Sequence, residues 1–338
     1  MKAYVLESVG NIKYKDVDEP QLKSGWVLLK VKAAGICSSD IPRVFTTGTY
    51  HFPTIPGHEF CGEVVKVFDE SDKKLIGKRM GVFPLIPCKK CEFCRQGHYE
   101  MCKYYDYLGS RRDGGFAEFV AVPTWNLIEL PKNVSYEQAA VLEPLAVAYH
   151  AISSIDYNKV SNVGIVGTGA IALFVAIILK SKKIDVTIIG RNENKRNLVK
   201  KCGIEKYIVS SNENDFSQYD VVCEAVGSND SLIHSIEITK SGGQLILIGN
   251  PYSNMTLEKN IYWQILRRQL IIRGTWNSMY DNNNSSDWSN VIAMLAKGQI
   301  NTQDVITHIL KKENLLEGLE IMKNHKEIYG RIVVKFDE

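Results

Sequence analysis

Four cysteines in the stretch CKKCEFCRQGHYEMC have the spacing of a metal site. Cys88, Cys91, Cys94 and Cys102 follow the pattern C-x2-C-x2-C-x7-C, and each two-residue gap lets two thiolates of one tight turn reach the same ion. Four thiolates complete a tetrahedral zinc shell with bonds of about 2.3 Å. Such a shell is closed to substrate, so we predict a structural zinc that braces this lobe.

Two alternatives to structural zinc stay open at this point. An iron–sulfur cluster also uses a run of cysteines, but its usual run ends in C-x3-C-P, whereas here the last gap is seven residues and Lys103 follows. Unliganded thiols are the second alternative. A disulfide framework is not expected, because the opening residues MKAYVLESVG do not form a signal peptide and cytosolic thiols are kept reduced. We therefore expect a cytoplasmic protein.

A glycine pattern indicates a dinucleotide site. Gly167, Gly169 and Ala172 form G-x-G-x-x-A between a run typical of a strand and a run typical of a helix. The first glycine permits the tight turn, the second lets the backbone approach a pyrophosphate, and the alanine allows close packing of helix on strand. The residues predicted to contact the cofactor here are Gly167, Thr168, Gly169, Ala170 and Ile171.

The choice of cofactor depends on the end of the next strand. An acid is expected there to bind the ribose 2′-OH of NAD, but the sequence has Gly190 followed by Arg191. A missing acid beside a cation favours the 2′-phosphate of NADP, so we predict NADP, with Gly190, Arg191 and Arg196 in the site. The alternatives are NAD as cofactor, with Arg191, Lys195 and Arg196 as ordinary surface residues.

The elements that must position these residues belong to two patterns. Residues 1 to about 147 contain short β-branched and aromatic runs such as WVLLKVKAAGIC, CGEVVKVF and FAEFVAV. From Val160 onward, apolar runs such as NVGIVGTG, DVTIIG, YDVVCEAVG, GGQLILIG and QLIIRGTW alternate with helical segments, as in a parallel sheet covered on both faces. A polar loop, NSMYDNNNSSDW, and a last strand, GRIVVKF, follow. The predicted fold class is α/β, with a β-rich domain and a doubly wound Rossmann domain.

The composition excludes several classes of partner. The chain has 338 residues, 45% of them hydrophobic and 23% charged, and a net charge of +3, which is too small to indicate nucleic acid or membrane binding. The longest apolar run, Ala170 to Leu179, is shorter than the ~20 residues that span a bilayer. The expected partner is a small molecule.

Taken together, these motifs resemble the zinc-containing medium-chain dehydrogenases, which include the alcohol and polyol dehydrogenases. The segments that carry the resemblance cover nearly the whole chain: GICSSD, PGHEFCGEV, the four-cysteine lobe, GGFAEFV, EPLAVAYHA and GIVGTGAIA. The resemblance implies a GroES-like catalytic domain from residues 1–147 and 277–338, a Rossmann domain from residues 148–276, a catalytic zinc in the cleft between domains, and a homodimer or homotetramer. With the structural zinc this makes two zinc ions per chain.

The same resemblance implies the catalytic residues. Cys37 and His58 would bind the catalytic zinc with Glu143 as the preferred third ligand, Glu59 as the alternative, and exchange between the two. His58 and Glu59 would point to opposite faces of a regular strand, so both reach one ion only if the backbone at Pro56–Gly57 is irregular. Ser39 occupies the place of the relay hydroxyl that takes the substrate proton. Cys61, Cys202 and Cys223 are expected to be small buried apolar side chains.

Within this family, CSSDIPRVF, YDYLGSRRDGGFAEF and RGTWNSMY resemble dehydrogenases of phosphorylated hexitols. Guanidinium groups suit a phosphate, and aromatic and imidazole side chains suit a polyol. The predicted substrate residues are Arg43, Tyr50, His51, Arg111, Arg112 and Trp276. Alternatively, Arg111 and Arg112 fix a loop by pairing with Asp106, Asp113 or Glu118. Rival functions are another zinc polyol or secondary-alcohol dehydrogenase, for sorbitol, ribitol 5-phosphate or threonine, and a zinc-free quinone reductase.

Overall fold

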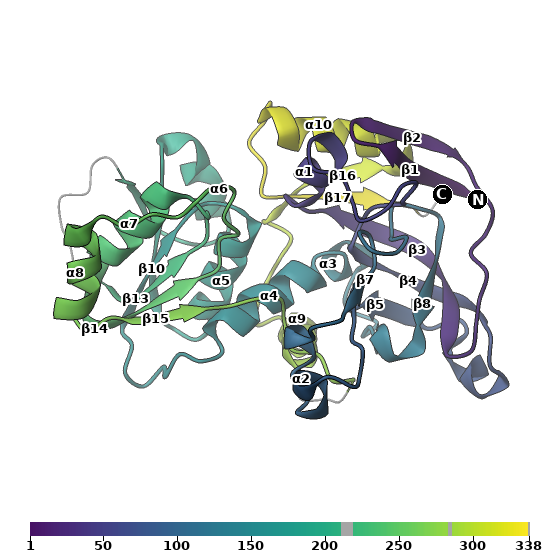
Figure 1. Ribbon diagram of the computed structural model, residues 1–338, viewed down its shortest axis with the longest axis horizontal. Helices are drawn as coiled ribbons and strands as arrows, with labels where there is room; N and C mark the ends of the chain where they lie inside the picture. Colours follow the sequence, from purple (N-terminus) through teal and green to yellow (C-terminus); the bar gives the residue numbers. More distant parts are fainter. Residues whose placement is uncertain (211–218, 283–285, 337–338) are drawn as a thin grey trace. The chain divides into compact units, whose positions relative to one another are not determined.

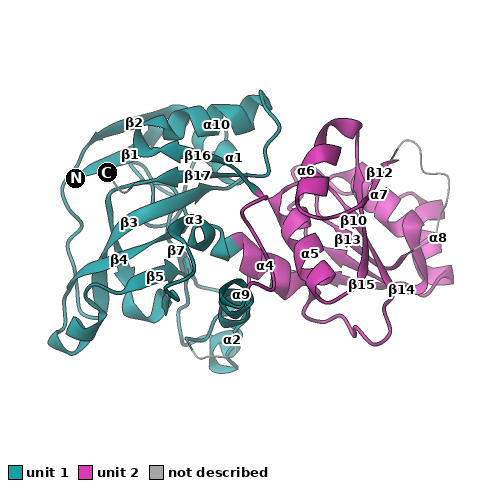
Figure 2. Cartoon of the chain, turned by 180° about the vertical axis from the view of Figure 1, so that it is seen from behind, with its two compact units in different colours: residues 1–143, 279–297, 306–338 teal, residues 144–278, 298–305 magenta. Residues whose placement is uncertain are grey.

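The computed structural model describes residues 1–210, 219–282 and 286–336, so part of the predicted polar loop, residues 283–285, lies outside the described residues. The chain divides into two compact units (Figures 1 and 2). Unit 1 comprises Met1–Glu143, Met279–Lys297 and Ile306–Glu338, and unit 2 comprises Pro144–Ser278 and Gly298–Val305. The predicted domain limits differ from these units by a few residues and by the assignment of residues 298–305.

Unit 1 is built on a mainly antiparallel sheet. Among the described residues its strand order is β16-β17-β3-β4-β5-β9, with β8 paired to β3. These strands are β3 (Trp26–Ile36), β4 (Glu59–Val67), β5 (Arg79–Val82), β8 (Phe119–Pro123), β9 (Leu127–Glu129), β16 (Ile306–Lys311) and β17 (Arg331–Lys335). Two short ladders flank the sheet: β1 (Lys2–Ser8) with β2 (Asn11–Asp16), and β6 (Leu85–Ile86) with β7 (Asp106–Tyr107).

The C-terminal segment returns to the first part of the chain. Strand β17 pairs antiparallel with β3, with Ile332 opposite Ile36, and in Figure 1 the yellow strands lie between α10 and the purple N-terminal strands. Apolar residues of the two segments share one core, which includes Leu29, Ile36, Ile332 and Val334. The helices that contribute to this unit are α1 (Asp40–Phe45), α2 (Glu92–Arg95), α3 (Tyr136–Ala139), α9 (Asp287–Ala296) and α10 (Leu315–Asn324).

Unit 2 is the predicted doubly wound domain. Its parallel strands run in the order β12-β11-β10-β13-β14-β15 within the described residues, so the order reverses beside β10, where such sheets bind nucleotides. The strands are β10 (Asn162–Val166), β11 (Asp185–Gly190), β12 (Lys206–Val209), β13 (Tyr219–Glu224), β14 (Thr239–Leu247) and β15 (Ile271–Gly274). The helices are α5 (Ala170–Ser181), α6 (Arg196–Lys201), α7 (Asn229–Ile238) and α8 (Lys259–Arg267), while α4 (Leu142–Ile152) begins at the end of unit 1.

Burial explains why these apolar runs form one sheet. Helix α5 is buried from Ala172 to Leu179, and Val163 and Ile165 of β10 have no exposed surface, so both strand and helix lie inside the unit. Helix α6 is short, because a 3-10 turn, Glu193–Lys195, precedes it. No described helix combines the length and apolar character that crossing a bilayer requires.

Candidate functional site

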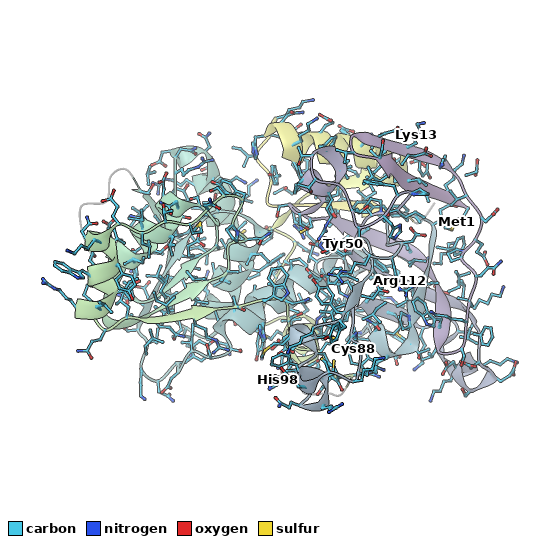
Figure 3. All side chains as sticks on the ribbon, viewed as in Figure 1. Met1, Lys13, Tyr50, Cys88, His98 and Arg112 are labelled. Atoms are coloured by element: carbon cyan, nitrogen blue, oxygen red, sulfur yellow. The ribbon has the colours of Figure 1, made fainter. Side chains whose placement is uncertain are left out.

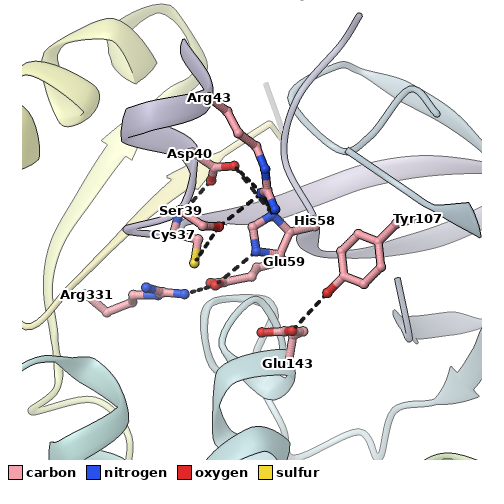
Figure 4. Close-up of polar contacts among 9 residues, drawn as sticks. All are labelled: Cys37, Ser39, Asp40, Arg43, His58, Glu59, Tyr107, Glu143 and Arg331. Atoms are coloured by element: carbon pink, nitrogen blue, oxygen red, sulfur yellow. Dashed lines mark hydrogen bonds and ion pairs between the residues drawn. The ribbon is translucent and has the colours of Figure 1, made fainter. Parts of the chain in front are cut away.

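Three donor side chains meet at the ends of neighbouring strands in unit 1. Cys37 directly follows β3, His58 directly precedes β4, and Glu59 is the first residue of β4. One ligand atom from each lies within 4.8 Å of the others, and Figure 4 shows the three side chains facing one space. His58 and Glu59 are buried, with 4% and 1% of their surface exposed.

An irregular backbone lets the adjacent residues His58 and Glu59 point to the same place. Gly57 has φ +94°, and a Cβ there would lie 2.4 Å from the Phe116 ring, so only glycine fits. Strand β4 begins at Glu59, which leaves His58 outside the alternating pattern of the strand. Opposite Glu59 in the ladder is Gly35, where a Cβ would lie 2.6 Å from Glu59 Oε2.

Asp40 was not predicted, although it is central to this cluster. It is fully buried, and its Oδ2 accepts a hydrogen bond of 2.9 Å from the Cys37 backbone N–H. Its Oδ1 lies 3.4 Å from His58 Nδ1, so it orients the imidazole from the side away from Glu59. A carboxylate behind a ligating histidine fixes the ring and its tautomer. The sequence signal was the i+3 position of Asp40 after Cys37.

Ser39 and Arg43 line the same cluster. Ser39 Oγ donates to Cys37 Sγ at 3.3 Å and accepts from Arg43 Nη1 at 3.0 Å. Ser39 stands at the start of α1 without a side-chain capping bond, so capping does not explain it. Arg43 Nη1 also lies 3.3 Å from His58 Nδ1 and 3.5 Å from Asp40 Oδ1.

A buried arginine, also not predicted, faces Glu59. Arg331, the first residue of β17, is 4% exposed and pairs through Nη2 with Glu59 Oε1. Glu59 Oε2 is buried and has no hydrogen-bond partner. Such an unpartnered carboxylate oxygen is costly unless a cation or donor meets it. The sequence signal was a charged residue directly before the apolar residues IVV of β17.

The structure groups Glu59, rather than the preferred Glu143, with Cys37 and His58. Glu143 accepts a hydrogen bond of 3.2 Å from the Tyr107 hydroxyl, and the Tyr107 ring lies 5.9 Å from the His58 ring. Burial raises the pKa of Glu143 to about 7. Glu143 is therefore near the cluster but is not one of the three donor residues that the structure groups together.

The electrostatics of the cluster prepare a thiolate. Burial alone would raise the pKa of Cys37, but the charge and hydrogen bond of His58 outweigh it and lower this pKa to about 5. Burial opposes protonation of His58, yet Asp40 and Cys37 raise its pKa to about 10. One sulfur, one imidazole nitrogen and one carboxylate oxygen match the donors that zinc takes in catalytic sites. Cys37, His58 and Glu59 therefore fit zinc.

The four-cysteine lobe forms a second cluster in unit 1, which includes α2 and contains the labelled Cys88 of Figure 3. The sulfurs of Cys88, Cys91, Cys94 and Cys102 lie within 4.8 Å of one another. Cys88 Sγ is 3.9 Å from Cys94 Sγ, and Cys91 Sγ is 4.0 Å from Cys102 Sγ. All four are free thiols, and four converging sulfurs fit a closed zinc shell.

Backbone N–H groups support negative charge on this lobe. The N–H of Cys88 donates to Cys102 Sγ at 3.2 Å, and the N–H of Cys91 donates to Cys88 Sγ at 3.4 Å. Backbone hydrogen bonds lower the pKa of Cys91 to about 6, whereas burial raises the pKa of Cys94. Of the neighbouring cations, Lys103 pairs with Glu92 at 2.9 Å.

The glycine turn in unit 2 has the form that a pyrophosphate needs. Gly167 has φ +123°, and a Cβ there would lie 3.0 Å from Val226. Gly169 precedes α5, and a Cβ built on it would have no atom within 4 Å beyond its chain neighbours. Thr168 lies between the two glycines, and Ala170 and Ile171 open the helix. The first N–H groups of α5 are thus available to an anion.

The predicted cofactor residues beyond this turn behave differently from one another. Gly190 ends β11 and Arg191 is exposed. Arg196, by contrast, donates to Glu193 Oε1 at 2.8 Å and to the Tyr207 carbonyl at 3.0 Å. Its guanidinium is thus committed to protein partners, and it carries no observation in favour of direct cofactor binding.

The two predicted substrate arginines, Arg111 and Arg112, have different partners. Arg112 forms an ion pair with Asp106, which is the alternative interpretation in which the arginine fixes a loop. Arg111 lies 4.3 Å from the ring centroids of both Tyr50 and Tyr105, and its Nη1 donates to the Tyr105 carbonyl at 3.0 Å. His51 Nε2 lies 3.1 Å from the carbonyl of Arg111.

The remaining predicted residues have simpler surroundings. Trp276, in unit 2, follows β15 and is 60% exposed. Cys61 and Cys223 are fully buried, as expected of small apolar side chains, whereas Cys202 is only half-buried, because it lies at the end of α6.

Comparison with known proteins gives consistent matches over the whole chain. Residues 23–132 match the alcohol dehydrogenase GroES-like domain, and residues 170–297 match the zinc-binding dehydrogenase domain. The chain is 30% identical to galactitol 1-phosphate 5-dehydrogenase of Escherichia coli (strain K12), over 91% of this chain and 92% of that protein. It is 27% identical to L-threonine 3-dehydrogenase of Yersinia pestis, over 98% of each.

Two solved structures have the same fold. The crystal structure of galactitol-1-phosphate dehydrogenase from Escherichia coli aligns with a TM-score of 0.90 and 28% identity, over 99% of this chain and 100% of that one. A zinc-binding dehydrogenase from Sinorhizobium meliloti 1021, bound to NADP, aligns with a TM-score of 0.88 and 26% identity, over 99% and 98% of the two chains.

Proposed function

Because the chain belongs to the zinc-binding medium-chain dehydrogenases, we propose that it oxidises a secondary alcohol of a polyol phosphate to a ketose phosphate, with NAD(P) as hydride acceptor. The substrate pair we propose is galactitol 1-phosphate and tagatose 6-phosphate. The observation that carries the proposal is the group formed by the half-buried Cys37 and the buried His58 and Glu59, in which Glu59 Oε2 is unpartnered.

The proposed zinc ligands of the catalytic site are Cys37, His58 and Glu59, with Glu143 as an exchanging fourth group. A zinc ion bound there supplies a Lewis acid that polarises the substrate hydroxyl. Asp40 holds both the Cys37 loop, through the backbone N–H at 2.9 Å, and the His58 ring, at 3.4 Å. The four clustered cysteines of the lobe are proposed to hold the second, structural zinc.

Ser39 is the proposed proton relay: its hydroxyl accepts the substrate proton and releases its own proton toward solvent. Its Oγ is 3.3 Å from Cys37 Sγ, so a hydroxyl bound beside that sulfur is within reach of it. Arg43 donates to the same Oγ at 3.0 Å and stabilises negative charge that develops there. A positioned acid–base group contributes about 10²- to 10⁴-fold to rate.

The phosphate of the substrate is proposed to bind at Arg111. Its guanidinium is held between two tyrosine rings, which fixes the donors of a side chain suited to phosphate. A chain of ring contacts connects it to the cluster: Tyr105 lies 6.1 Å from Tyr107, and Tyr107 lies 5.9 Å from His58. A substrate longer than a simple alcohol is therefore expected.

The proposed cofactor is NADP, with NAD as the alternative. The glycine turn before α5 fits a pyrophosphate, and the absence of an acid at Gly190 beside the exposed Arg191 favours a 2′-phosphate. The NADP-bound relative from Sinorhizobium meliloti has the same fold. A threonine-type substrate is the second candidate, favoured by the 27% identity to L-threonine 3-dehydrogenase.

A homodimer or homotetramer in the cytosol is also proposed. Strand β15 is an edge of its sheet within the described residues, and its Ile271 and Ile272 are 60% and 40% exposed. On α8, which precedes this strand in the chain, Trp263 and Leu266 are 45% and 55% exposed. An open apolar edge strand invites pairing with a second copy. Free cysteines that bind zinc need a reducing compartment.

A substrate panel tests the proposal. Galactitol 1-phosphate, galactitol, sorbitol, ribitol 5-phosphate and L-threonine would each be assayed with NAD and with NADP. We expect the highest kcat/KM for galactitol 1-phosphate. Arg111→Met should raise KM for galactitol 1-phosphate at least about tenfold and leave KM for unphosphorylated polyols unchanged. The matched variant Arg112→Met should leave KM for galactitol 1-phosphate unchanged. Preferred turnover of threonine would contradict the proposal.

A further inference from the structure

A tyrosine on the next strand occupies the space that a side chain at position 190 would need. Strands β11 and β12 run side by side, with Ile188 opposite Tyr207 and Gly190 opposite Val209. Residues 188 and 190 share one face of β11, so a long side chain at 207 can reach over position 190. A Cβ on Gly190 would lie 2.1 Å from Tyr207 Oη, 2.7 Å from Tyr207 Cζ and 3.0 Å from Thr168 Cγ2.

These contacts identify the place that an acid would need. Thr168 belongs to the pyrophosphate turn, so the space beside Gly190 lies between that turn and the end of the second strand. This is where a carboxylate binds the ribose 2′-OH in NAD-specific relatives of the fold. Here the Tyr207 hydroxyl fills that space instead, and it carries no negative charge.

The tyrosine is fixed in this position by several contacts. Tyr207 is 6% exposed, and its hydroxyl donates to the Asn192 carbonyl at 2.5 Å. The Arg196 guanidinium lies 4.9 Å from its ring centroid and donates to its backbone carbonyl at 3.0 Å. Glu193 pairs with Arg196 and holds it there. Moving the ring away would break the hydrogen bond to Asn192 and the stacking on Arg196 together.

We propose that Tyr207 acts on the ribose specificity of this chain indirectly: its hydroxyl occupies the space of the missing acid and so excludes a carboxylate side chain at position 190. The inference rests on the dinucleotide site of the proposed function and names the residue behind its cofactor preference. Arg196 and Glu193 act as positioning residues for Tyr207. The 2′ position of the cofactor then meets an uncharged hydroxyl and the exposed Arg191, and no carboxylate.

Four variants test this assignment: Gly190→Asp, Tyr207→Val, Gly190→Asp with Tyr207→Phe, and Gly190→Asp with Tyr207→Val. Dissociation constants for NAD and NADP would be measured by titration with the cofactor alone, and melting temperatures in its absence. Gly190→Asp should lower the melting temperature by several degrees and weaken both cofactors at least about fivefold, because the new Cβ collides with the tyrosine. Tyr207→Val should keep the wild-type ratio of the two constants within about threefold.

The two double variants test whether the Tyr207 ring excludes an acid at position 190. With Tyr207→Val, the aspartate has room, so the ratio of NAD to NADP affinity should rise at least about tenfold over wild type. With Tyr207→Phe the ring carbon still lies 2.7 Å from the new Cβ, so the losses of Gly190→Asp should persist. A Gly190→Asp protein that is as stable as wild type and gains NAD affinity would overturn the inference. So would a Tyr207→Val double variant without that gain.

The proposed NADP preference fails separately from this inference. Wild-type protein that binds NAD more tightly than NADP would refute that preference. The same series would still show whether the effect of Gly190→Asp on cofactor affinity and melting temperature depends on residue 207. If neither cofactor bound wild type, the melting temperatures alone would test the steric part. A loss from Gly190→Asp that Tyr207→Val fails to relieve would refute it.

Discussion

Removing Arg331 should destabilise the metal-free protein far more than the zinc-loaded protein. Arg331 and Glu59 form a buried pair, with 5% and 0% of their side chains exposed. Breaking such a pair by removing one partner leaves an uncompensated buried charge and costs about 3–5 kcal/mol. For a unit of this size each kcal/mol corresponds to about 2–4 °C. We therefore expect Arg331→Met to lower the melting temperature of metal-free protein by about 6–20 °C.

Zinc should recover much of this loss. The Glu59 carboxylate lies with Cys37 and His58, and its Oε2 has no hydrogen-bond partner in the described part of the chain, so a bound cation can replace the guanidinium as its counter-charge. A ligand that binds the folded state and not the unfolded state stabilises the folded state. With zinc restored, the difference between Arg331→Met and wild type should fall to less than half its metal-free value.

Calorimetry on chelator-treated and zinc-reconstituted protein makes the comparison. Lys312→Met is the matched control, because Lys312 pairs with Glu118 at 3.1 Å, with 15% and 25% of their side chains exposed, and should cost about 1 kcal/mol with no dependence on zinc. Adding Glu59→Gln to Arg331→Met should recover stability in the metal-free protein, since a neutral pair replaces a broken one. Equal losses with and without zinc would refute the reasoning.

Three further predictions concern separate parts of the chain. Ser39→Ala should lower kcat by about 10²- to 10⁴-fold while metal analysis still finds the zinc content of wild type; an unchanged kcat would exclude Ser39 as proton acceptor. Cys94→Ser should remove one zinc per chain and lower the melting temperature, whereas the buried Cys223→Ser in unit 2 should keep all the zinc; loss of zinc from both would contradict the assignment. Burial raises the pKa of Asp220, but Lys240 and the N–H and hydroxyl groups of Ser161 outweigh burial and hold this pKa below its usual range. A carboxyl whose pKa is lower in the folded state stabilises the protein at pH values above its unfolded pKa of about 3.9. This stabilisation is lost as the pH falls through the folded pKa. Asp220→Asn should therefore cost about 1–3 kcal/mol at pH 7 and much less near pH 2, as read from urea unfolding at both pH values; an equal loss at both would contradict the sign.

Local sequence patterns predicted most of the fold. The runs of β10, β11 and β13 are largely apolar, because a parallel sheet covered by helices buries both faces of its strands, and this pattern predicted the Rossmann unit. Strand β12 was missed. It has four residues and begins with the exposed Lys206, so the run is too short and too polar at its start to be distinguished from a loop.

The site was predictable only where residue type carried the signal. Cysteine spacing predicted the lobe, and the family resemblance predicted Cys37 and His58. Asp40 and Arg331 were missed because their roles depend on tertiary placement: the pairing of β17 with β3 brings Arg331 beside the end of β3, almost three hundred residues away in sequence. Tyr207 was missed for the same reason, since only the register of β11 and β12 brings it over Gly190.

The charges of the cluster compensate one another in the metal-free protein. In the described structure the thiolate of Cys37 and the carboxylates of Asp40 and Glu59 face the imidazolium of His58 and the guanidinium groups of Arg43 and Arg331. These anions and cations balance, so the buried group carries little net charge, as burial requires. A divalent ion therefore adds about two positive charges to a balanced site.

The charge balance is restored if two protons leave the site when the metal binds. A histidine ligand must be neutral, so His58 would release the first proton. The second can come from Glu143, whose pKa of about 7 lets it ionise at neutral pH beside the cluster. With the proposed ligand set, the two carboxylates would have different tasks: Glu59 would bind the metal, and Glu143 would provide the compensating charge.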